Sequence, residues 1–82
     1  GIPSLRYSTA VEGQDLVVRF EQDGDVYDVP VTLAVTYADG KTAEFIVAVK
    51  DSVTEARFPL NGAIRSIDAN PDGAAVAIIE KK

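Results

Sequence analysis

The chain has 82 residues, a formal net charge of −5, and neither cysteine nor histidine. Without these two residue types, a disulfide framework, a zinc site built on them and the common catalytic triads are all excluded. The basic residues are few and scattered, and no apolar run is long enough to span a membrane, so we expect neither nucleic-acid binding nor membrane insertion.

Apolar residues that alternate with polar ones between regularly spaced turn signals predict seven short strands. In chain order the predicted strands cover residues 5–11, 16–20, 29–37, 42–50, 56–60, 64–67 and 76–79. The turns between them include Gly13-Gln14, Asp23-Gly24, Asp39-Gly40, Asn61-Gly62 and Pro71-Asp72-Gly73. This pattern predicts an all-β fold, specifically a seven-stranded antiparallel β-sandwich of immunoglobulin or fibronectin-III type.

Period-two alternation also predicts which residues face the core. In the first strand the predicted inner face carries Leu5, Tyr7, Thr9 and Val11. The clearest alternation runs from Val29 to Lys50 around the Asp39-Gly40 turn, and there Ile46 is the one large apolar residue on the outward side. The tyrosines divide in the same way, because Tyr7 and Tyr37 have inward parity, which leaves Tyr27 as the candidate for outward display.

Two prolines refine the strand predictions, because proline cannot donate a hydrogen bond to a sheet. Pro59 predicts that the fifth strand lies at a sheet edge or ends there. Pro30 predicts a similar break near the start of the third strand, or a bend where that strand changes partners.

The length predicts a single domain covering residues 1–82. The chain contains no methionine and begins with Gly1, which we interpret as the remnant of a removed tag. We therefore expect a fragment of a longer protein. The sequence leaves open whether that protein is cytoplasmic, periplasmic or secreted.

Two clusters of oxygen-bearing side chains are candidate calcium sites. The first consists of Asp23, Asp25 and Asp28. The second consists of Asp68, Asn70 and Asp72, which have the spacing of a calcium loop but are not followed by its closing glutamate. A solvated hairpin tip explains the first cluster and a plain turn explains the second, so we expect no cofactor in this domain.

The order of elements resembles the small β-sandwich domain that follows the catalytic domain in M1-family zinc aminopeptidases. The segments that carry the resemblance are Phe20-Glu21-Gln22, Tyr27-Asp28-Val29-Pro30-Val31-Thr32-Leu33, Tyr37-Ala38-Asp39-Gly40-Lys41, Phe58-Pro59-Leu60 and Ile67-Asp68-Ala69-Asn70-Pro71-Asp72-Gly73. The His-Glu-x-x-His motif of the family has no counterpart, so no catalytic or zinc-binding residue is carried over to this chain. Many bacterial members of the family end at this sandwich.

The resemblance implies a non-catalytic structural domain whose partner is the catalytic domain of the parent chain. Four apolar residues fall on the outward side of their strands and are the candidates for the interdomain patch or for burial between the sheets: Val17, Ile46, Val53 and Ile79. We expect the isolated domain to be monomeric or weakly self-associating. The alternative is a fibronectin-III-like binding or adhesion module of a surface or carbohydrate-active protein, with its site at Tyr27 and the Asp23, Asp25 and Asp28 cluster.

Overall fold

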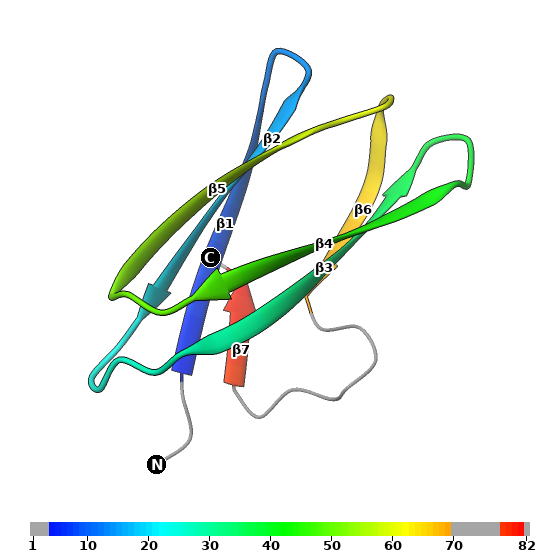
Figure 1. The fold of residues 1–82 in the computed structure, drawn as a ribbon. Helices are drawn as coiled ribbons and strands as arrows, with labels where there is room; N and C mark the ends of the chain where they lie inside the picture. Colours follow the sequence, from blue (N-terminus) through cyan, green and yellow to red (C-terminus); the bar gives the residue numbers. More distant parts are fainter. Residues whose placement is uncertain (1–3, 70–77, 82) are drawn as a thin grey trace.

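The computed structural model describes residues 4–69 and 78–81, and these residues contain strands and no helix. The strands are β1 (Ser4–Glu12), β2 (Asp15–Gln22), β3 (Val29–Tyr37), β4 (Thr42–Val49), β5 (Val53–Pro59), β6 (Ile64–Ala69) and β7 (Ile78–Lys81). The all-β prediction is confirmed, and the first six predicted strands correspond to β1–β6 (Figure 1).

The strands form two sheets that pack face to face. Sheet A has the order β5-β2-β1-β7, and sheet B has the order β4-β3-β6. Strands β1–β6 make two antiparallel three-stranded sheets, in which the chain forms the β1–β2 hairpin and then crosses to sheet B for the β3–β4 hairpin. It returns to sheet A with β5 and crosses again with β6 (Figure 1).

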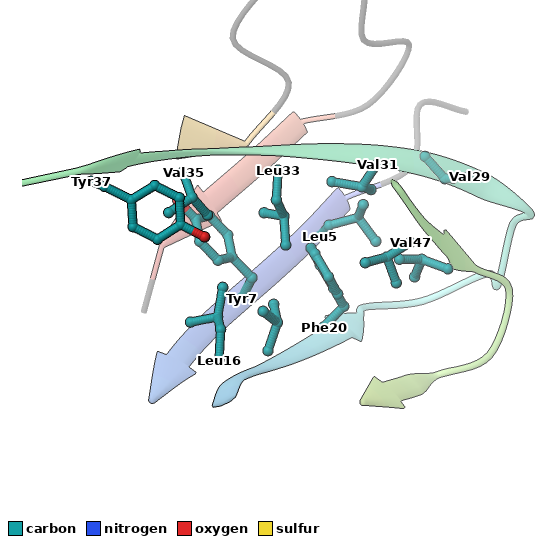
Figure 2. Packing of buried hydrophobic residues seen from close by; sticks show 12 residues of the cluster. Leu5, Tyr7, Leu16, Phe20, Val29, Val31, Leu33, Val35, Tyr37 and Val47 are labelled. Atoms are coloured by element: carbon teal, nitrogen blue, oxygen red, sulfur yellow. The ribbon is translucent and has the colours of Figure 1, made fainter. Parts of the chain in front are cut away.

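The core lies between the two sheets and follows the predicted alternation. Leu5, Leu16 and Phe20 of sheet A point toward β3, and the fully buried side chains of β3 point back between them (Figure 2). Tyr7 and Tyr37 are both buried, as their parity predicts. The members of the cluster are Leu5, Tyr7, Leu16, Val18, Phe20, Val29, Val31, Leu33, Val35, Tyr37, Val47 and Val49.

An aromatic pair closes the core on the side where β4 and β5 approach each other. The rings of Phe45 and Phe58 stack with their centroids 4.5 Å apart. Because one ring belongs to β4 and the other to β5, the pair joins the two sheets where no backbone hydrogen bonds connect β4 to β5 among the described strands.

A β-bulge explains why the inward residues of β6 are three positions apart. Ser66 pairs with Thr36, but the next pair along the strands is Tyr37 with Ile64, so Arg65 is the extra residue. The bulge lets Ile64 and Ile67 both pack against the core although a regular strand would place them on opposite faces.

The prediction of a wholly antiparallel sandwich is wrong for the last strand. β7 is short and pairs in parallel with β1 from Ser4 to Tyr7. It begins at Ile78, whereas the predicted strand covers residues 76–79, and positions 76 and 77 lie outside the described residues.

The prediction that Val11 lies on the inner face of β1 is wrong. It has the same parity as Leu5 and Tyr7, but it is 59% exposed. The described part of β7 reaches only as far as Tyr7, so no described strand lies beside β1 on that side at Val11.

The predictions made from the two prolines have different outcomes. Pro59 is the last residue of β5, which lies at the edge of sheet A, as predicted. The break predicted at Pro30 is wrong, since β3 runs through it and Pro30 pairs with Ala48. On the side of β6, the described pairing covers only residues 33–37 of β3. Pro30 therefore has a described partner strand on one side only, and its missing N–H is tolerated.

Candidate functional site

The outer face of sheet A is a charged surface whose ions pair with one another. Arg57 lies 2.8 Å from Glu12 and 3.2 Å from Asp15, and the hydrogen bonds to these carboxylates raise the pKa of the Arg57 guanidinium. Further ion pairs join Arg6 to Asp23, and Arg19 to Glu21 and Glu55. Exposed pairs of this kind contribute little to stability, but they leave a well-solvated face with balanced charge.

The outer face of sheet B has a different chemistry. The strand register places its residues in rows across the sheet: Pro30 beside Ala48, Thr32 beside Ile46, Ala34 between Glu44 and Asp68, and Thr36 between Thr42 and Ser66. None of these residues is basic, and most are small. Ile46 stands out from this surface because its side chain is 70% exposed.

The four residues predicted to form the interdomain patch do not lie together. Ile46 is on the outer face of sheet B, whereas Val17 lies between Ala10 and Arg57 on the outer face of sheet A. Val53 is 43% exposed at the start of β5, next to Glu21 on sheet A. The side chain of Ile79 lies outside what the structure describes. Ile46 is therefore the member of this set that lies among mostly small neighbours, with Glu44 as the nearest charged residue on its own strand.

Gln22 holds the β2–β3 loop through a buried amide. Its Nε2 donates to the carbonyl oxygens of Tyr27 at 2.7 Å and Asp51 at 3.3 Å, and its Oε1 accepts from the backbone N–H of Tyr27 at 2.9 Å. The side chain thus joins the β2–β3 loop to the β4–β5 connection, and Gln22 is buried in consequence. The sequence prediction does not assign this role, although Gln22 continues the inward parity of Leu16, Val18 and Phe20.

Tyr27 is not displayed as the sequence predicts. It is half-buried and packs against the core, because Gln22 holds its backbone close to the sheet. The more exposed apolar residue of this loop is Val26, at 48% exposure. Val26 lies in a loop, where no strand alternation exists to predict its exposure from the sequence.

The candidate calcium ligands that the structure describes do not form a metal-binding group. Among residues 4–69 and 78–81, no three acidic side chains are placed to hold a metal ion together. In the first cluster Asp23 is paired with Arg6 at 3.0 Å. In the second cluster Asp68 lies on the outer face of β6, whereas Asn70 and Asp72 lie outside the described residues.

A shallow depression of about 470 Å³ lies at the end of the sandwich between the β1–β2 turn and the β5–β6 connection. It is lined by Val11, Gly13, Gln14 and residues 60–63, and a hydrogen bond from the Leu60 N–H to the Gln14 carbonyl at 2.8 Å joins the two segments. None of the lining side chains is ionisable, so this depression lacks a group for acid–base chemistry.

Comparison with known proteins finds no family model that matches the chain and no curated protein with a significant match. Within the part of the chain that the structure describes, no helix could cross a membrane.

Proposed function

We propose that this chain is a non-catalytic β-sandwich domain that packs against a neighbouring domain of its parent protein through the outer face of sheet B. The parent we propose is an M1-like zinc metallopeptidase, and the neighbour is its catalytic domain. In this role the sandwich is a structural support, and the chemistry of the parent lies elsewhere.

The observation that carries the proposal is the contrast between the two outer faces. Sheet A presents paired charges, which are costly to remove from water. The rows of sheet B present mostly small side chains around the exposed Ile46, and Glu44 and Asp68 are the charged residues in those rows, so most of this face costs little to bury. Of the two faces, the outer face of sheet B is therefore the less costly one to bury against a neighbouring domain.

The proposed kind of sandwich is supported by the way the strands divide between the sheets. In immunoglobulin-type sandwiches the first, second and fifth strands share one sheet, and the third and sixth share the other. Here β1, β2 and β5 belong to sheet A and β3 and β6 to sheet B, whereas β7, which that arrangement places with the third and sixth strands, pairs with β1 in sheet A. The segments that resemble the M1-family domain include the ends of β2 and β5, the start of β3 and the turn between β3 and β4.

Activity assays and the parent gene test the metallopeptidase assignment. We expect the isolated chain to leave aminoacyl-anilides uncleaved while the full-length parent hydrolyses them. The parent gene should encode a His-Glu-x-x-His motif upstream of this domain. A parent without that motif would overturn the assignment.

A binding or adhesion module is the second candidate, and the Gln22 clamp is the observation that favours it. Loops that present ligands in sandwiches work best when the scaffold holds them in one conformation, and Gln22 does this for the β2–β3 loop. Calorimetric titrations with calcium and with a panel of glycans test this function. Heat that disappears in Val26→Ser or Asp25→Asn supports it, and the absence of heat with every ligand counts against it.

A further inference from the structure

Within the described residues, the acidic side chains on the outer face of sheet B lack the cationic partners that those of sheet A have. Glu44 and Asp68 are exposed and flank Ala34 in one row across the sheet. Three arginines neutralise carboxylates on and beside sheet A, but no ion pair is found for Glu44 or Asp68 in the same part of the chain. Arg65, the cation nearest in sequence to Asp68, donates instead to the Ala38 carbonyl at 3.0 Å.

The geometry of the row fixes the spacing of these two charges. Glu44 and Asp68 lie on strands separated by one intervening strand, so their backbones are about 10 Å apart. Ile46 is two residues from Glu44 on the same strand and the same face, about 7 Å along it. The surface thus combines one protruding apolar side chain with two carboxylates at a set distance.

We infer that the domain docked on sheet B carries an apolar socket for Ile46 flanked by lysine or arginine side chains that pair with Glu44 and Asp68. This inference rests on the proposed function and adds the chemistry of the partner surface. An apolar partner without such cations would bury the two carboxylates unpaired, which is strongly unfavourable. A partner with acidic residues there would repel them, and the overall charge of −5 adds to that repulsion.

Cysteine labelling in the intact parent protein tests the inference, because this chain contains no cysteine of its own. Ala48→Cys places a thiol on the same face, next to Pro30, and mass spectrometry measures its alkylation rate. We expect slow labelling at low salt and at least about tenfold faster labelling when NaCl is raised from about 20 mM to about 500 mM, because salt screens the charge pairs.

Neutral variants separate the charge pairs from docking itself. In the Ala48→Cys parent, Glu44→Gln with Asp68→Asn should speed labelling at low salt and remove most of its salt dependence. The matched control is Glu55→Gln on sheet A, which should leave the labelling rate at low salt and its salt dependence unchanged. Urea unfolding of each 82-residue variant confirms that the sandwich is intact.

Two results would overturn different parts of the account. Unchanged salt dependence in the Glu44→Gln/Asp68→Asn variant, with the thiol at position 48 still protected, would refute the basic socket and leave docking on sheet B in place. Labelling at position 48 that is as fast in the parent as in the isolated chain, at every salt concentration, would refute docking on this face.

Discussion

Gln22 joins the β2–β3 loop and the β4–β5 connection to the end of β2 by side-chain hydrogen bonds. Its amide satisfies three backbone groups of the β2–β3 loop and the β4–β5 connection. Replacement by alanine leaves those groups without their partner in a partly buried site, so Gln22→Ala should lower the free energy of unfolding by about 2–3 kcal/mol. Urea denaturation measures this loss.

Gln14→Ala is the matched control for Gln22→Ala, because Gln14 lies exposed in the β1–β2 turn. We expect a change within about 0.5 kcal/mol there. Equal stabilities for the two variants would show that the Gln22 clamp does not hold the loop.

Thr54 presents the opposite situation, a buried hydroxyl without a hydrogen-bond partner among the described residues. It faces the core beside Phe20. Thr54→Val keeps the shape and removes the unsatisfied oxygen, so it should raise the free energy of unfolding by about 1 kcal/mol. The exposed Thr42 on sheet B provides the control, because Thr42→Val should be nearly neutral. A loss of stability in Thr54→Val would mean that the hydroxyl has a partner such as a buried water.

At the scale of elements, the β3–β4 hairpin depends on one glycine. Gly40 has a φ of 89° and closes the turn by donating from its N–H to the Tyr37 carbonyl at 2.9 Å. Gly40→Ala should cost about 1–2 kcal/mol, because an L-residue is strained at positive φ. The strain is purely conformational, since an added Cβ would meet no atom within 4 Å.

Gly62 is the matched control, because it has equal space around it and is not among the glycines with positive φ. Gly62→Ala should be neutral or slightly stabilising, because alanine restricts the unfolded chain. Thermal unfolding of the two variants compares them directly, and a loss of similar size in both would contradict the backbone explanation.

The strands themselves can be predicted from sequence, but their partners cannot. Alternation places Val29, Leu33 and Val47 in the core and Ile46 outside it, as the structure confirms. The sequence does not state which sheet a strand joins, so Val17 and Ile46 could not be assigned to opposite faces. The bulge at Arg65 and the parallel pairing of β7 also depend on neighbours that are distant in the chain.

The same limit applies to the candidate site. Ile46 can be identified from sequence because it breaks parity within its own strand, which is a local signal. The unpaired charges of Glu44 and Asp68 become apparent only when β4 and β6 are placed on either side of β3. Gln22 has an inward parity, but its partners at Tyr27 and Asp51 lie on two different connections.

At the scale of the whole molecule, alkaline pH should destabilise the fold through Tyr7. Burial raises the pKa of Tyr7 above 10.0, and the negative charge of Asp68 raises it further. Above about pH 10 the unfolded chain loses this proton while the folded chain keeps it, so stability falls as pH rises toward the folded pKa. Tyr7→Phe removes this contribution.

Urea unfolding between about pH 9 and about pH 11 tests the linkage. The native chain should lose stability more steeply with pH than Tyr7→Phe, and Asp68→Asn should lie between them. Identical slopes for the native chain and Tyr7→Phe would contradict the assignment to Tyr7.

The central claim is that the outer face of sheet B is buried against a neighbouring domain and the outer face of sheet A is not. The most direct measurement is the alkylation rate of a single cysteine at position 46, introduced as Ile46→Cys, in the isolated chain and in the full-length parent. Arg19→Cys on sheet A is the reference position. We predict labelling at least about tenfold slower at position 46 in the parent, with an unchanged rate at position 19. Equal rates at position 46 in the two proteins would contradict the account.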